Sequence, residues 1–358
     1  MKKFKFLAVI LVVVMAVGLF GACSGGNSGG SGNASSGGPE FVLKFANYNP
    51  LNTPIGEYEA IAFAYIEEQS NGRIKIEPYY NGTLLDVMDT WSGTGDGLAD
   101  ISYLYITVIS GVQPVGEIFS QYFSYPAPNT MDTLKAHRKV LEDIPEIQAE
   151  AARGNMIILD VFGPNGGPLA MTRDIDIKVP EDLRGLTITA NGIYIDILPQ
   201  VGAAGVSLPP SDWYTSLERG VIDALCMNWN GIRAFGIEDL ATHYIVYGDK
   251  LGLTGGGAEY LMNLDTWNSL PEDLQKIVVD GIHIASDMLA EYEYNEQFEV
   301  IDAVVANGAV LHYIDEKDMQ PWYDFAAKAN ELWVQSISGL GYDGQAIWDT
   351  YLYHMTNY

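Results

Sequence analysis

The sequence predicts an α/β protein with two domains, and three observations lead to this fold class. Segments with strand-like and helix-like patterns alternate along the chain, as in sheets whose strands are joined by helical crossovers. About 320 residues follow the N-terminal region, enough for two domains with separate cores. One helical pattern that begins near residue 272 is long enough to lie across both domains, at ~1.5 Å per residue.

The first 22 residues have the pattern of a signal peptide. Three lysines precede an uncharged apolar run, Phe6 to Phe20, which is shorter than the ~20 residues that span a bilayer. The sequence Phe20-Gly21-Ala22-Cys23 resembles the bacterial lipobox, in which the leader is cut before a cysteine whose thiol is lipidated. We therefore expect Cys23 to carry a lipid; the alternative is ordinary secretion.

Residues 24–39 after the cysteine are rich in Gly and Ser, and the lipidated Cys with this tether is expected to span 23–40. Such chains are flexible coils, and about 16 residues reach ~20–25 Å. We expect this segment to tether a folded body to a membrane, in the periplasm or at the cell surface.

In the first half of the body, strands alternate with two helical segments. The helix near Tyr58–Ile66 is apolar at helical spacing and is stopped by Asn71-Gly72. The expected strands are 41–46, 74–77, 100–105 and 156–162, and a second helix is expected over 131–153.

The second half repeats this alternation. Strands are expected at 186–189, 205–208, 224–228 and within 252–263, with helices near 192–201 and 211–219. Ser269 and Glu272 have capping-box spacing at the start of a helix that we expect to exceed 30 residues.

Composition excludes several classes of function. The formal net charge of −27 predicts that the surface repels nucleic acid and anionic lipid. After Cys23 only Cys226 remains, so the body has no intramolecular disulfide, and an apolar neighbourhood predicts a buried, inert thiol.

Signatures of catalysis and metal binding are missing from the sequence. The five histidines show no H-E-x-x-H and no paired metal spacing, and there is no G-x-S-x-G elbow. The G-x-G-x-x-G of residues 339–344 follows a helical stretch and has no room for a complete βαβ unit after it. We expect no catalytic residue, metal or cofactor.

Six segments together resemble the DctP-type family, the periplasmic solute-binding subunits of TRAP transporters. Each motif alone is weak, but their order and spacing over about 300 residues are specific. The segments are Asn71–Glu77, Asn81–Leu85, Gly97–Ile101, Lys178–Ile188, Tyr214–Asp223 and Met262-Asn263.

This resemblance implies a two-domain periplasmic-binding-protein-like fold with a long helix spanning both domains. Domain I would comprise 41–163 plus about 253–299, and domain II 164–252 plus about 300–358. The implied function is capture of a small organic solute in the interdomain cleft and delivery to a membrane permease, without catalysis. The alternatives are an ABC-importer or sensor-linked receptor and, from another class, an exported α/β hydrolase.

One residue departs from the family pattern. Family members place an Arg that binds a ligand carboxylate where this chain has Thr189, and a hydroxyl offers a hydrogen bond but no charge. The resemblance implies further contacts from Asn191, which follows Thr189, and from Asn165 in a glycine-rich turn. Asn165 either belongs to a backbone nest for an oxyanion or to a hinge turn, and Arg173 is expected to be a surface cation.

Aromatic side chains suggest the character of the ligand. Asn228-Trp229 follows a strand and matches the family's cleft-facing segment; the alternative is a Trp packed beneath the loop. The other candidate contacts are Tyr48, Trp91, Tyr103 and Trp213. This set predicts an organic acid with an aromatic or apolar body.

Overall fold

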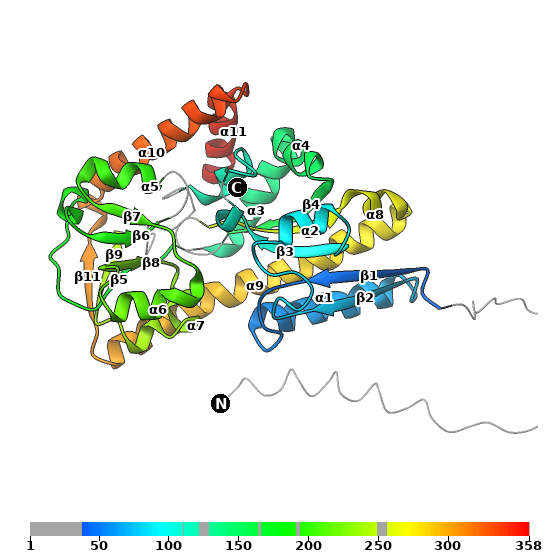
Figure 1. Ribbon diagram of the computed structural model, residues 1–358, viewed down its shortest axis with the longest axis horizontal. Coiled ribbons are helices and arrows are strands. Elements are labelled where there is room, and N and C mark those ends of the chain that lie inside the picture. Colours follow the sequence, from blue (N-terminus) through cyan, green and yellow to red (C-terminus); the bar gives the residue numbers. More distant parts are fainter. Residues whose placement is uncertain are drawn as a thin grey trace, which may run out of the picture. The chain divides into compact units, whose positions relative to one another are not determined.

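The structure is a computed structural model that describes residues 38–109, 111–121, 129–163, 166–190, 194–248 and 256–357. Its strands and helices alternate along most of the chain (Figure 1). The strands are β1 Phe41–Ala46, β2 Ile74–Tyr79, β3 Ile101–Tyr105, β4 Met156–Phe162, β5 Leu169–Met171, β6 Thr187–Thr189, β7 Ala204–Val206, β8 Ala224–Cys226, β9 His243–Tyr247, β10 Ala258–Asn263 and β11 Val310–Ile314. The α-helices are α1 Pro54–Gln69, α2 Thr90–Gly95, α3 Thr130–Asp143, α4 Pro145–Arg153, α5 Tyr194–Ile197, α6 Pro210–Glu218, α7 Trp229–Ala234, α8 Leu264–Ser269, α9 Glu272–Ala306, α10 Gln320–Gly339 and α11 Gly344–Thr356.

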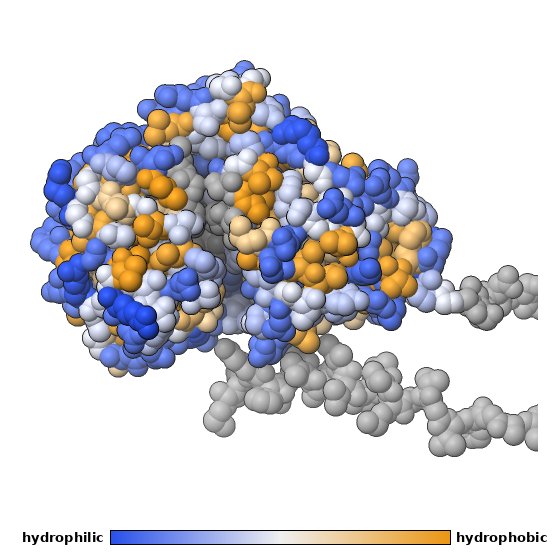
Figure 2. All heavy atoms as spheres, viewed as in Figure 1, coloured by the Kyte–Doolittle hydropathy of each residue, from blue (hydrophilic) through white to orange (hydrophobic). Residues whose placement is uncertain are grey.

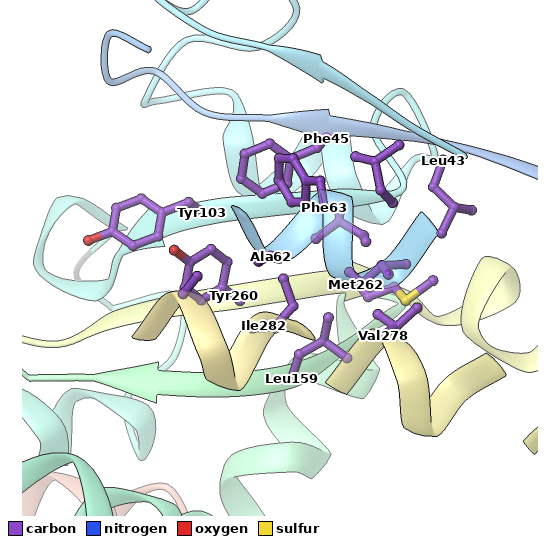
Figure 3. Packing of buried hydrophobic residues seen from close by; sticks show 14 of the residues in the cluster. Leu43, Phe45, Ala62, Phe63, Tyr103, Leu159, Tyr260, Met262, Val278 and Ile282 are labelled. Atoms are coloured by element: carbon purple, nitrogen blue, oxygen red, sulfur yellow. The ribbon is translucent and has the colours of Figure 1, made fainter. Parts of the chain in front are cut away.

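The first sheet has the order β2-β1-β3-β10-β4, with β10 antiparallel to both of its neighbours. One face packs on α1 and the first part of α9, where Phe45, Tyr260 and Ile282 lie in one core (Figure 3). A second core joins the sheet to α3, α4 and α11. We call this sheet with these helices the first lobe.

The second sheet has the order β11-β9-β5-β8-β6-β7, and β5 is antiparallel to β8 and β9. Trp322 and Phe325 of α10 belong to the core on one face, and Val300 and Val304 of α9 to the core on the other. We call this sheet with its covering helices the second lobe. The two-sheet α/β architecture confirms the predicted fold class.

Helix α9 is the longest element and belongs to both lobes. Its 35 residues confirm the predicted length above 30. It packs on α1 and α3 along its first part and on α7 toward its end (Figure 1). The chain also crosses between the sheets from β4 to β5 and from β9 to β10.

Three local predictions are wrong in detail. The helix expected over 131–153 is two helices, because Pro145 has no N–H to continue α3 and begins α4 instead. The capping box does not form: Ser269 ends α8, its hydroxyl donates to the Thr266 carbonyl, and the N-cap of α9 is Pro271. The strand within 252–263 begins at Ala258, and residues 249–255 lie outside the described residues.

The C-terminal helices connect the lobes. Trp322 near the start of α10 packs in the second lobe, whereas Trp333 near its end packs in the first. Helix α11 packs on α3, although the expected boundary gave residues 300–358 to domain II. Hydrophilic residues cover much of the visible surface of both lobes, with apolar residues scattered among them (Figure 2).

Candidate functional site

The candidate site lies where the ends of strands from both sheets meet the middle of α9. Tyr105 ends β3, and its pKa is raised to about 12 by burial and by the nearby Glu293 of α9. One turn further on, Glu296 accepts a hydrogen bond of 2.8 Å from the Asn230 amide of α7. This segment of α9 therefore contacts both lobes.

Tyrosines line the first-lobe side of this junction. The Tyr103 ring lies 5.5 Å from that of Tyr105, 5.1 Å from that of Tyr260 and 6.3 Å from that of Tyr48 (centroid distances). Tyr103 and Tyr260 lie beside each other between the sheet and α9 (Figure 3). Burial raises the pKa of Tyr48 and of Tyr103 well above the usual value, so both hydroxyls keep their protons.

Neither the Tyr48 nor the Tyr103 hydroxyl makes a hydrogen bond of normal geometry to the described residues, and both oxygens are buried. An unpaired buried hydroxyl costs free energy. Tyr105 is the neighbour of both, through its hydroxyl at Tyr103 and its backbone at Tyr48, so a ligand that bonds these hydroxyls would compete with Tyr105.

Buried carboxyl groups behind the tyrosines are held in the neutral form. Glu59 accepts from the Asn47 amide at 2.8 Å and from the Tyr260 hydroxyl at 3.1 Å, yet burial raises its pKa to about 8. Burial, and next the charge of Glu296, raise the pKa of Glu293 to about 8 as well. At neutral pH Glu293 therefore does not repel an anion.

On the second-lobe side, Thr189 ends β6. Its hydroxyl oxygen accepts from the backbone N–H of Cys226 at 3.0 Å, which leaves its hydrogen free to donate. Thr189 lines a small, mainly apolar pocket between the ends of β6 and β8 and the helices α5 and α10. The other lining residues are Leu169, Leu183, Ile188, Ala190, Tyr194, Leu198, Cys226, Trp322 and Phe325.

Three aromatic residues of this pocket, Tyr194, Trp322 and Phe325, were not among the predicted site residues. Trp322 and Phe325 come from α10, more than a hundred residues after Thr189, so no local motif links them. Cys226, predicted to be buried, is half-buried at the pocket wall.

The turn from β8 to α7 is fixed by tight backbone packing. Asn228 is the N-cap of α7, and its side-chain oxygen accepts from the Gly231 N–H at 2.9 Å. Gly167, in the crossover from β4 to β5, packs against this turn, and a Cβ there would lie 1.7 Å from the Met227 carbonyl oxygen. Only glycine fits this approach, so Gly167 fixes how closely its backbone packs on the turn.

The three predicted tryptophans lie in packed surroundings. Trp229 is fully buried and packs against Tyr244, as the alternative of a packed Trp describes. Trp91 packs in the first-lobe core against Gly154 and Met156. Trp213 packs edge-on against Phe235, and its indole N–H donates to the Leu208 carbonyl.

The remaining predicted residues are placed as follows. Asn165, Asn191 and Cys23 lie outside the described residues. Arg173 forms an exposed ion pair with Asp223, as expected of a surface cation. Among the described residues, no helix is both long and apolar enough to cross a bilayer.

Comparison with known sequences identifies relatives along most of the chain. The profile of bacterial extracellular solute-binding protein family 7 matches residues 45–336. A solute-binding protein of Chromohalobacter salexigens is 25% identical over 297 residues, which cover 78% of this chain and 82% of that protein.

Solved structures share the fold. A marine metagenome TRAP solute-binding protein specific for aromatic acid ligands, in complex with 3-hydroxybenzoate, superposes with a TM-score of 0.77 at 21% identity, covering 88% of this chain and 98% of that one. A TRAP periplasmic solute-binding protein of Chromohalobacter salexigens with bound D-glucuronate superposes with a TM-score of 0.71 at 20% identity, covering 86% and 99%. The same architecture therefore holds ligands with flat aromatic and with polar sugar bodies.

Proposed function

This chain belongs to bacterial extracellular solute-binding protein family 7, and we propose that it captures a small organic acid with an aromatic or apolar body for a TRAP permease. The observation that carries the choice of ligand is the surroundings of Thr189. Where the family resemblance implies a guanidinium for the ligand carboxylate, this chain has a hydroxyl at the wall of an apolar, aromatic pocket. Such a pocket favours an apolar body over a hydroxylated sugar.

We propose that the two lobes hold different parts of the ligand. The apolar body faces the second-lobe pocket at Thr189, and the carboxylate faces the donors of the first lobe, Tyr48 and Tyr103. Asn228, and from the sequence alone Asn165 and Asn191, are proposed as further polar contacts. A ligand that contacts both lobes favours the closed arrangement, and only that difference in contact can drive closure.

We propose further that the chain is exported and held at a membrane through lipid on Cys23, with residues 23–40 as the tether. Its partner would be a pair of TRAP membrane subunits, encoded beside its gene. An adjacent ATPase gene would instead indicate an ABC-importer receptor, and an adjacent sensor kinase gene a sensor-linked one.

Identification of the retained ligand tests the choice of ligand class. Mass spectrometry of the purified protein, followed by calorimetry with benzoate-like acids and with sugar acids, should show tighter binding of the aromatic acids. A protein that binds sugar acids alone would refute the proposed ligand. Recovery of the ligand unchanged after incubation separates a receptor from an exported hydrolase.

Substitution Thr189→Val tests the hydroxyl while keeping the side-chain shape. We propose that this hydroxyl donates one hydrogen bond to a polar group carried on the ligand body, so its loss should weaken binding of the retained acid about tenfold. Thr187→Val is the matched control, because Thr187 lies on the same face of β6 but two residues before its end. Equal losses in both variants would mean that the effect reflects the strand and not a ligand contact.

The neutral state of Glu293 predicts a pH dependence of binding. As pH rises through about 8, Glu293 releases its proton and the new charge opposes an anionic ligand. Affinity should therefore fall between pH 7 and pH 9, and Glu293→Gln should remove most of that fall. Calorimetry at the two pH values measures both; an unchanged affinity in the wild type would contradict the placement of the carboxylate near α9.

A further inference from the structure

A cluster of three potential metal ligands lies in the second lobe away from the candidate site. His243 begins β9, His312 lies in the neighbouring parallel strand β11, and Asp174 follows β5. Their ligand atoms all lie within 4.8 Å of one another. The three residues are far apart in the sequence and are brought together by the pairing of β9 with β5 and β11.

The two imidazole nitrogens lie at hydrogen-bond distance, whereas the carboxylate distances suit a shared metal ion better than hydrogen bonds. His243 Nδ1 lies 3.1 Å from His312 Nε2, and Asp174 Oδ1 lies 3.7 Å from the first nitrogen and 3.6 Å from the second. The two carboxylate distances are too long for hydrogen bonds. A tetrahedral ion about 2.0–2.1 Å from each atom would hold its ligands about 3.3–3.4 Å apart, in the middle of this range.

The charge of the cluster also suits a cation. Two imidazole nitrogens 3.1 Å apart cannot both carry a proton without repulsion, so one lone pair is directed at the other ring. Asp174 adds a negative charge, and its side chain is 70% exposed, which leaves the fourth position of an ion open to water. The neighbouring Arg173 does not compete for Asp174, because its guanidinium bonds Asp223.

The cluster and Thr189 lie at opposite ends of the parallel strands of this sheet. Strands β6, β8, β9 and β11 all run in the same direction, because β5 is antiparallel to both β8 and β9. His243 is the first residue of β9, whereas Thr189 is the last of β6. An ion at the cluster would therefore not contact a solute in the cleft.

We propose that Asp174, His243 and His312 form a binding site for a borderline divalent ion of the Zn²⁺ class. Imidazole nitrogens with one carboxylate are ligands that Zn²⁺, Co²⁺ and Ni²⁺ accept and that Mg²⁺ does not favour. The bound ion joins the segment after β5 to β9 and to the edge strand β11, and so stabilises that edge of the second lobe.

The test uses the chain purified without a histidine tag and freed of metal with a chelator. Calorimetry with Zn²⁺ should show one saturable site per chain and a raised melting temperature, and Co²⁺ should produce the visible absorption of a tetrahedral complex. Mg²⁺ at the same concentration should have neither effect, which separates the site from general attraction to an acidic protein. Absence of a saturable Zn²⁺ site would overturn the proposal.

Variants locate the site. His312→Ala and Asp174→Asn should each weaken Zn²⁺ binding by about tenfold or more. His354→Ala is the matched control. His354 also faces one carboxylate, that of Asp143 at 2.8 Å, but among the described residues it belongs to no cluster of three potential metal ligands. Asp174 is exposed, so its variant keeps the fold even if His312→Ala does not. Unchanged affinity in Asp174→Asn, or an equal loss in His354→Ala, would overturn the assignment.

Discussion

A partly buried arginine of each lobe bonds α9, and the two attachments differ in strength. In the first lobe, Arg138 of α3 bonds the fully buried Asp160 at 2.7 and 3.0 Å and Asp287 of α9 at 2.8 Å. In the second, Arg233 of α7 lies 3.3 Å from Glu238 and 3.4 Å from Glu296 of α9.

The two lobes also differ in where their buried carboxyl groups lie. The carboxyl groups that are buried and protonated at neutral pH among the described residues, Glu59, Glu259 and Glu293, lie in the first lobe or at the middle of α9. The first lobe and the start of α9 are joined by the shorter and more deeply buried ion pair. The contact of α7 with the end of α9 is the weaker joint, and we expect domain closure to be accommodated there.

The largest effect should follow from Arg138→Ala. The substitution leaves Asp160 buried without its cation, which costs about 3–5 kcal/mol of unfolding free energy. Denaturant unfolding measures the loss. Arg73→Ala is the control: Arg73 bonds Glu40 and Asp273 of α9 at 2.7 Å, but all three side chains are exposed, so its loss should cost far less than that of Arg138. Equal losses would show that burial does not set the strength of the first attachment.

Raising the pH should weaken the first lobe by an intermediate amount. The pKa of Glu59 is about 8 in the folded chain against 4.5 when unfolded, so between these values the folded state holds a proton that the unfolded state has released. Stability therefore falls as pH rises through this window and levels off above about 8. Glu59→Gln should remove the part of that fall that the titration of Glu59 contributes.

The check is thermal or denaturant unfolding at pH 5, 7 and 9 for both proteins. Because Glu259 and Glu293 act in the same direction, the variant should retain part of the slope. A variant with the full wild-type slope would mean that Glu59 does not titrate in this window.

The smallest effect on stability should come from Arg233→Ala. Its guanidinium is partly exposed and its ion pairs are long, so the loss should be about 1 kcal/mol. If the joint at α7 accommodates closure, the same variant should change ligand affinity more than Arg138→Ala does, when both are measured by calorimetry under conditions where each is folded. The reverse order would place the flexible joint in the first lobe.

Local patterns predicted the elements whose signals are local. The alternation of Ile74 and Ile76 with charged residues predicted β2, and positive φ angles at Asn71 and Gly72 explain why α1 stops where the sequence indicated. The length of α9 followed from its sustained apolar spacing. Pro145, in contrast, divides a helical pattern that predicts one continuous helix.

Contacts between distant segments could not be predicted in the same way. Trp322 and Phe325 reach the Thr189 pocket from α10, and the two histidines of the proposed metal cluster come from strands 69 residues apart. For Trp229 the local signal pointed to a contact that the fold does not favour. Its position after a strand predicted a side chain facing the cleft, but in the structure it is buried against Tyr244. The order of strands in the second sheet determines which of these residues meet, and residue spacing along the chain does not specify that order.

The position of β10 has a consequence for how the chain acquires its structure during synthesis. Strand β4 ends at Phe162, and the strand that joins it to β3 begins only at Ala258, after almost the whole second sheet has emerged. Until then β3 and β4 each expose an unpaired edge that can associate with other chains. We expect the nascent protein to depend on a chaperone that binds this unfinished sheet, and to be most prone to aggregation when translation is interrupted between these two strands.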